Sequence, residues 1–146
     1  MWWRWIAGML LVTGLGGCLL SETLDSSYDD MADARKKGGI GNGWIPEWLP
    51  ASTRAIREVH NVDNNLQLIA FKIEPGQSWP LPDGCRSIAP ESLAPMRFSR
   101  SWAPSIDELR RAHVFYHCPS APAGDGWFIA IDAKQASVVM WTAWYE

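Results

Sequence analysis

The first 18 residues constrain the rest of the chain most, because they decide the compartment in which it folds. The opening residues carry one basic side chain, Arg4, and a short apolar run follows over residues 6–15 before Gly16, Gly17 and Cys18. A charged start, a short apolar stretch and small residues at the end are typical of a cleaved secretory signal peptide. A membrane-spanning helix, the alternative, needs about 20 apolar residues, roughly twice what this run offers. We therefore expect residues 1–17 to be removed.

The end of this segment predicts what happens to the new N-terminus. Leu15-Gly16-Gly17-Cys18 resembles the lipobox of bacterial lipoproteins. The resemblance implies that Cys18 receives a diacylglycerol and an acyl chain such as palmitate, and several acyl chains on one residue give stable anchoring. Leu19 stands where lipoproteins retained in the inner membrane carry aspartate. The resemblance thus implies a protein anchored in the cell envelope, at the outer membrane.

The cysteines then predict a cross-link. With Cys18 assigned to lipid, Cys85 and Cys118 remain, and in an oxidising compartment two remaining cysteines most simply pair. The bridge would close a loop of about 34 residues, worth roughly 3 to 4 kcal/mol in the chain-entropy model. The alternative is a zinc site that also uses His113 and His117. Those histidines lie in a predicted strand, where positions four apart are roughly 13 Å from each other, too far to bind one ion.

Composition limits the partners of the mature chain. Residues 18–146 are enough for one domain. Without Arg4, 12 basic residues face 16 acidic ones, a net charge of −4. These charges are spread out with no basic stripe, so nucleic acid is not an expected partner.

The pattern along the chain divides it into two parts after the signal peptide. Residues 18–42 read as a lipidated N-terminus, a tether and a short helix, which begins near Ser26 and ends at Gly38-Gly39. Residues 43–146 read as the globular domain, which opens with a proline-rich extended segment. A short helical turn is expected from Ala51-Ser52, because Ile56 and Val59 would share one helix face.

The remaining segments predict the sheet. Residues 66–74 and 114–118 read as strands, and residues 127–132 and 137–145 read as a β-hairpin. Ser105 and Glu108 form a capping box for a short helix that ends near Arg111. Together these patterns predict an α+β fold: an antiparallel sheet of about four strands, one to three short helices and one disulfide.

One stretch of the chain resembles a known family. The residues that carry the resemblance are Gly43, Trp44, Pro46, Leu49, Pro50, Ser52, Asp63 and Asn65. They resemble the pattern of small bacterial lipoproteins that have a YbbD-like head domain. The resemblance spans most of residues 30–146 and is densest over 43–65. It implies an envelope lipoprotein and carries no activity.

Patterns of catalysis and metal binding are weak in this sequence. Asp63, Asn65 and Glu74 have the spacing of positions 1, 3 and 12 of an EF-hand loop, but position 6 is Leu68 rather than glycine. We expect Asp63 or Asn65 to bond local backbone in a turn instead. The sequence has no G-x-S-x-G elbow and no glycine-rich phosphate loop. We expect no catalytic residues, no metal and no cofactor, hence a protein that is not an enzyme.

Tryptophan is the unusual feature of the composition, with seven of the ten remaining after cleavage. Trp141, Trp144 and Tyr145 would place aromatic rings on both faces of the last strand. Tryptophan and tyrosine are enriched at binding hot spots. We therefore expect a non-catalytic module that binds another envelope protein through these residues. The alternative is a module that binds a glycan such as peptidoglycan through exposed tryptophans.

Overall fold

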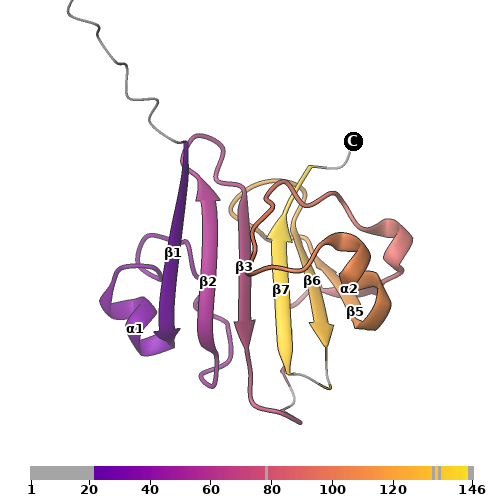
Figure 1. Ribbon diagram of the computed structural model, residues 1–146, viewed down its shortest axis with the longest axis horizontal. Helices are drawn as coiled ribbons and strands as arrows, with labels where there is room; N and C mark the ends of the chain where they lie inside the picture. The colour runs from indigo at the N-terminus through magenta and orange to yellow at the C-terminus, as the bar shows by residue number, and fades with distance from the viewer. Residues whose placement is uncertain (1–21, 78, 133, 135, 145–146) are drawn as a thin grey trace, which may run out of the picture.

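The computed structural model describes residues 22–77, 79–132, 134 and 136–144, which form one antiparallel sheet of seven strands with two short α-helices. The strand order across the sheet is β1-β2-β3-β7-β6-β5-β4 (Figure 1). In chain order the strands are β1 (Thr23–Asp30), β2 (Arg54–Asn61), β3 (Gln67–Lys72), β4 (Arg86–Ile88), β5 (Val114–Cys118), β6 (Trp127–Asp132) and β7 (Ser137–Thr142).

The predicted sheet of about four strands is wrong. The four expected strands are present as β3, β5, β6 and β7, with β6 and β7 paired as a hairpin. The structure adds β1, β2 and β4, which makes the fold mostly sheet rather than a balanced α+β mixture. Two of these added strands, β1 and β4, are the edges of the sheet. An edge strand has only one neighbour, so it can form from residues with little apolar character.

Strand β2 replaces the helical turn that was expected from Ala51-Ser52. Its register with β3 shifts between Arg54 and Arg57, which is a β-bulge, and Ala55 within the bulge has a positive φ of 52°. A bulge inserts an extra residue and breaks the period-two alternation that marks a strand. Ile56 and Val59 face opposite sides of the sheet, as residues three apart on a strand do, although their spacing suggested a common helix face.

The helices begin at capped positions. Helix α1 (Met31–Lys36) starts at Asp30, whose side chain accepts a hydrogen bond from the Asp33 amide at 2.8 Å. The start expected at Ser26 is wrong, since Ser26 lies within β1. Helix α2 (Ile106–Ala112) has the predicted capping box between Ser105 and Glu108. A single 3-10 turn, η1, spans Pro90–Ser92.

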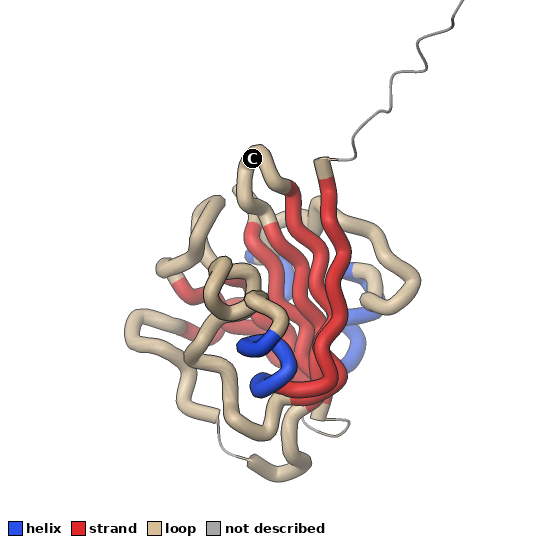
Figure 2. Tube along the Cα trace, turned by 90° about the vertical axis from the view of Figure 1, so that its left-hand side faces the viewer, coloured by secondary structure: helices blue, strands red, loops and turns tan. Residues whose placement is uncertain are grey.

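Each face of the sheet carries its own core. Figure 2 shows α1 and α2 on opposite sides of the strands. The side that α1 covers, here called the α1 face, is packed by Tyr28, Met31, Ile45, Leu49, Ile56, Ile69, Phe71, Ile129 and Met140. The side that α2 covers, the α2 face, is packed by Val59, Leu68, Leu109, Phe115, Phe128, Val139 and Trp141.

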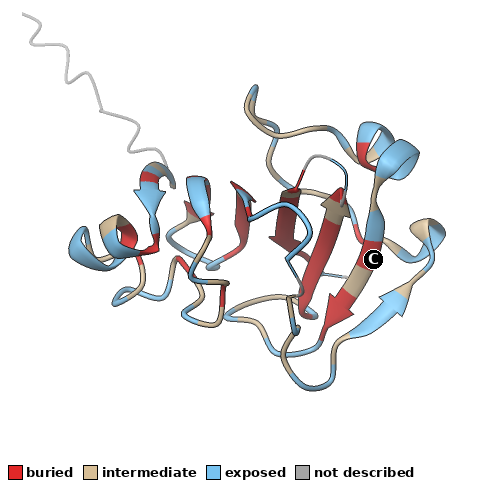
Figure 3. Ribbon diagram, turned by 90° about the horizontal axis from the view of Figure 1, so that it is seen from below, coloured by how far each residue is buried: buried red, intermediate tan, exposed pale blue. Residues whose placement is uncertain are grey.

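Burial follows the order of the strands. Seen from below in Figure 3, buried residues are concentrated in the central strands, whereas the edge strand β4 is largely exposed. A central strand buried on both faces reads as a nearly continuous apolar run, which is why β6 and β7 could be predicted. Strand β1 buries one residue, Tyr28.

The first and last described segments meet at one end of the sheet. Thr23 at the start of β1 pairs with Asn61 at the end of β2, and the described chain ends just after β7 at the same end (Figure 1). Trp144, one of the residues that the sequence singled out for binding, therefore lies near the N-terminal end of β1.

Candidate functional site

The tryptophans predicted to bind a partner have different environments. Trp141 is fully buried on the α2 face, where its Nε1–H donates to the Ala94 carbonyl at 3.1 Å. It therefore belongs to the core and does not form part of an exposed aromatic surface. Trp144 is 48% exposed. Tyr145 and Cys18 lie outside the described residues.

Trp144 lines a pocket of about 560 Å³ at its end of the sheet. This volume lies in the range of roughly 300 to 1,000 Å³ that is usual for ligand sites. Three segments meet there: the start of β1, the turn between β2 and β3, and a loop that lies on the α2 face. Its lining consists of Thr23, Asn61, Asn64, Leu66, Arg97, Phe98, Ser99, Arg100 and Trp144.

An ion pair holds the loop wall of this pocket against β1. Arg100 donates from Nε and Nη2 to the two carboxylate oxygens of Asp25, at 2.8 and 2.9 Å. Hydrogen bonding from Arg100 lowers the pKa of Asp25, so this carboxylate is ionised at neutral pH. The two-pronged geometry is the most specific that arginine offers, although an exposed pair contributes only about 1 kcal/mol or less. Its main effect is to place Arg100 and its neighbours at the pocket.

The floor of the pocket is a turn built from asparagines. The Asn61 side-chain oxygen accepts from the amides of Asp63 and Asn64 at 2.9 and 3.0 Å. Asn64 in turn accepts from the Leu66 amide at 3.0 Å, and Asn65 has a positive φ of 58°. The expected turn is present, but the side chains that bond the local backbone are those of Asn61 and Asn64 rather than Asp63 or Asn65.

The other residues of the family pattern lie between α1 and β2 and cover the α1 face. Trp44 stacks on the ring of His60, with centroids 3.5 Å apart and planes inclined by 8°. The Gly43 carbonyl accepts from Gln67 Nε2 at 3.4 Å. Leu49, between Pro46 and Pro50 in the pattern, is buried in the core. The Trp44 end of this segment thus covers polar side chains of β2 and β3.

Glu58 and His60 form a buried pair that the sequence pattern did not predict. They are 0% and 2% exposed, and Glu58 Oε1 lies 2.7 Å from His60 Nδ1. Glu58 Oε2, His60 Nε2 and Gln67 Oε1 have no hydrogen-bond partner among the described residues. The available signal was the spacing of Glu58 and His60 two apart on one strand face. The helical interpretation of this segment concealed it.

Burial sets the charge state of this pair. It raises the pKa of Glu58 to about 8, and the nearby negative charge of Asp25 adds to the effect. Burial also lowers the pKa of His60, against a smaller opposite influence of Asp25. At neutral pH both side chains are therefore uncharged, and the protonated Glu58 carboxyl donates a hydrogen bond to His60 Nδ1. Neither side chain lines the Trp144 pocket, so the pair serves the packing of β2 against Trp44.

This pair predicts that stability falls as pH rises above neutrality. Above pH 6.5 the unfolded chain holds a proton on neither side chain, while folded Glu58 keeps its proton up to about pH 8. The free energy of unfolding therefore drops by about 2 kcal/mol over this window. Below pH 6.5 the unfolded histidine takes up a proton before folded His60 does, because the pKa of folded His60 is lowered, and this opposes the slope due to Glu58. Urea unfolding at pH 6.5 and pH 8 measures the difference.

Glu58→Gln supplies the decisive variant for this pH dependence. Its amide can donate to His60 Nδ1 at every pH, so the decline between pH 6.5 and 8 should disappear. Glu108→Gln is the control, because Glu108 caps an exposed helix and its pKa is lowered rather than raised. A decline that persists unchanged in Glu58→Gln would show that another group is responsible.

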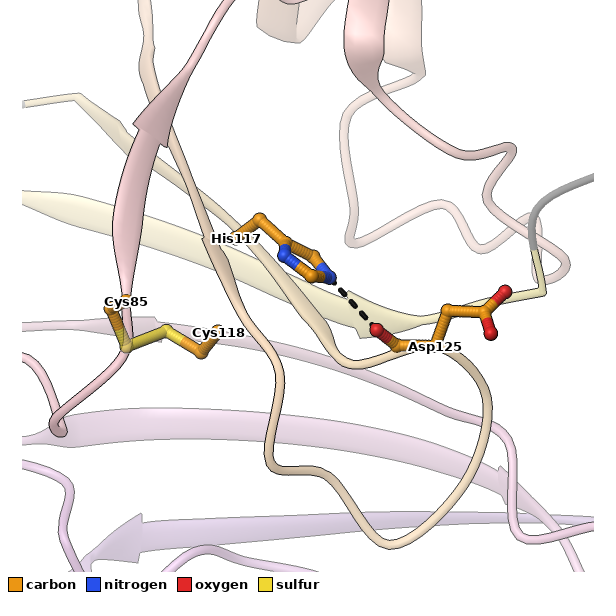
Figure 4. Close-up of a disulfide and its surroundings, with 4 residues drawn as sticks. All are labelled: Cys85, His117, Cys118 and Asp125. Atoms are coloured by element: carbon orange, nitrogen blue, oxygen red, sulfur yellow. Dashed lines mark hydrogen bonds between the residues drawn. A yellow bond between two sulfur atoms is a disulfide. The ribbon is translucent and has the colours of Figure 1, made fainter.

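The predicted disulfide is present. Cys85, just before β4, is bonded to Cys118 at the end of β5 (Figure 4). The neighbouring His117 donates from Nε2 to the Asp125 carbonyl at 2.8 Å, and His113 donates from Nδ1 to the Leu109 carbonyl at 3.1 Å. The sulfur atoms are bonded to each other rather than to zinc. In the part of the chain that the structure describes, no three His, Cys, Asp or Glu side chains gather in a way that could hold a metal ion.

Residues 22–72 match the YbbD head domain family, which confirms the resemblance to a YbbD-like head domain. The matched segment comprises β1, α1, β2 and β3, and it contains both the Glu58–His60 pair and four residues of the Trp144 pocket. The match is consistent with an envelope-associated protein. No curated protein and no solved structure matches the chain significantly. None of the helices among the described residues is long and apolar enough to cross a membrane.

Proposed function

From the YbbD head domain at residues 22–72 and the pocket beside Trp144, we propose that this chain is a lipid-anchored envelope protein that binds a partner protein without catalysis. The anchor is Cys18, and the outer membrane is its location. The observation that carries the proposal is the pocket, which joins an exposed tryptophan to arginine and phenylalanine side chains at one end of the sheet.

The composition of the pocket supports a protein partner. Tryptophan and arginine are the residue types most enriched at protein-binding hot spots, which sit in well-packed depressions. Trp144, Phe98 and Arg100 line this pocket together. The ion pair with Asp25 fixes the loop wall, and the asparagine turn fixes the floor, before a partner arrives. A preformed site costs less ordering entropy on binding than a loose one.

The position of the pocket limits where the partner can be. Thr23 lines the pocket and is five residues from Cys18 in the sequence. Five residues span at most about 18 Å when fully extended. If Cys18 carries the lipid, the pocket is held close to the membrane surface. The partner is then a membrane-proximal protein.

A glycan is the second candidate, and one observation favours it. The side-chain oxygens of Asn61 and Asn64 are occupied by the turn, which leaves the amide N–H groups as donors beside the exposed ring of Trp144. An aromatic ring flanked by amide donors offers an apolar face and hydrogen bonds at once, which suits a sugar.

In-cell crosslinking of the full chain, followed by affinity capture and mass spectrometry, tests the proposal. We expect Trp144→Ala to reduce the capture of a stoichiometric protein partner by tenfold or more, since a hot spot contributes roughly 2 kcal/mol or more. Val114→Ala is the matched control, because Val114 is 54% exposed but lies at the opposite end of the sheet. Equal capture by both variants contradicts the proposal. Crosslinks to peptidoglycan fragments that depend on Trp144 would establish the glycan candidate instead.

A further inference from the structure

A second pocket lies on the α2 face, near the end of the sheet away from Trp144. Its volume is about 420 Å³. The strands β2, β3 and β7 form its floor, and the segment with Trp102 and Pro104 forms a wall with helix α2. It shares no lining residue with the Trp144 pocket, so a ligand bound here would be independent of the partner protein proposed for Trp144.

The strand side of this pocket presents two cations. Arg57 pairs with Ala70 across β2 and β3, and Lys72 lies two residues further along β3, so both side chains project on the α2 face. The bulge at Ala55 sets this register. Neither Arg57 nor Lys72 forms an ion pair with any residue that the structure describes.

The acidic groups at the pocket are already engaged. The Glu108 carboxylate accepts from the amide and the hydroxyl of Ser105, both at 2.8 Å, as part of the capping box. Asp132 is buried and accepts from the Lys134 amide at 3.0 Å. Both carboxylates therefore already accept hydrogen bonds from their own elements, helix α2 and the β6–β7 hairpin.

The rest of the floor and wall is apolar. Ala70 and Val139 are cross-strand neighbours at the floor of the pocket. Trp102 packs against the α2-face core and lines the wall of the pocket. The pocket thus combines an apolar floor, an aromatic wall and two cations on one side. An apolar chain would be buried against this floor and wall, and the two cations would attract one negative group.

We propose that this pocket binds a small amphipathic carboxylate, with the carboxylate at Arg57 and Lys72 and the apolar chain against Ala70, Val139 and Trp102. A neutral chain lacks the charged contact, and a carboxylate without a chain lacks the apolar one. A ligand with both features is the one that uses all sides of the pocket.

Octanoate is the probe, with octanol and acetate as the ligands that lack one feature each. Titration into the purified protein is followed by calorimetry and by amide chemical-shift changes. We expect octanoate to bind roughly tenfold more tightly than octanol, which lacks the charge, and than acetate, which lacks the apolar chain. Octanoate should also shift the resonances of Ala70 and Val139.

Charge-removing variants complete the test. Arg57→Gln combined with Lys72→Gln should weaken octanoate binding roughly tenfold and leave octanol binding unchanged. Arg86→Gln, an exposed arginine on β4 far from the pocket, is the matched control and should bind octanoate as the original chain does. Octanoate that shifts no resonance near Ala70, or that binds the double variant with unchanged affinity, overturns the proposal.

Discussion

Replacing Trp141 with alanine is expected to lower the free energy of unfolding by about 3 to 5 kcal/mol, which is typical of a buried tryptophan. Its side chain has no exposed surface, and in the sheet register it lies between Leu68 on β3 and Phe128 on β6. The Phe128 ring stacks on it with centroids 5.8 Å apart. The substitution therefore opens a large cavity in the α2-face core and also leaves the Ala94 carbonyl without its donor. Urea unfolding followed by circular dichroism measures the loss.

Two further variants separate packing from other effects. Trp141→Phe keeps most of the side-chain volume and loses the hydrogen bond to Ala94. We therefore expect it to lower the free energy of unfolding by about 1 to 2 kcal/mol. Trp144→Ala, at a residue that is 48% exposed, should change stability by no more than about 0.5 kcal/mol. If Trp141→Ala were as mild as Trp144→Ala, the buried position of Trp141 would be wrong. The same pair of variants keeps a loss of partner binding in Trp144→Ala distinct from a loss of fold.

The strands that could be predicted are those buried on both faces. In β3, β6 and β7 at least four of the six residues are apolar, and such short apolar runs indicate strands. Strand β1 has the sequence TLDSSYDD, with one buried residue, and its polar side chains suggested a tether or a helix start. It is a strand because β2 offers it a continuous row of backbone partners from Tyr28 back to Thr23. That partner is a tertiary feature and leaves no local pattern.

Trp141 and Trp144 show that the exposure of a candidate binding residue also depends on tertiary structure. A tryptophan on either face of a last strand can be exposed or covered, and the sequence does not say which. The segment that includes Ala94 and Trp102 lies on the α2 face and covers Trp141. That segment is rich in proline and serine and read as a long loop. Its role as a cover depends on the path of the chain, which no local pattern encodes.

The buried Glu58–His60 pair escaped prediction for a different reason. Charged residues are almost never fully buried unless they are paired, so exposure was the reasonable expectation for each alone. Here the pair neutralises itself within a segment that Trp44 covers. The family pattern had marked Trp44, but what that ring packs on could be seen only in the structure.

Removing the disulfide is expected to lower the free energy of unfolding by about 4 kcal/mol, the value of the chain-entropy model for a separation of 33 residues. The change is Cys85→Ala combined with Cys118→Ala. Cys85 precedes β4, an edge strand of three residues paired only with β5, so the cross-link holds the weakest strand in register. Urea unfolding should show a lower midpoint. It should also show a steeper dependence on urea, because the unfolded chain without the cross-link exposes more surface.

Reduction of the unaltered protein separates the cross-link from packing. The reduced protein lacks the bond but keeps both sulfur atoms, whereas the double alanine variant also loses the buried side chain of Cys118. Reduction should therefore cause most of the loss in the free energy of unfolding. The double alanine variant should be less stable than the reduced protein by about a further 1 kcal/mol. If the free energy of unfolding of the reduced protein were within about 1 kcal/mol of that of the oxidised protein, β4 and its loop would be held by packing alone. The aromatic contacts of Trp79 with Trp48 and Phe71 would then be the contacts that hold this region.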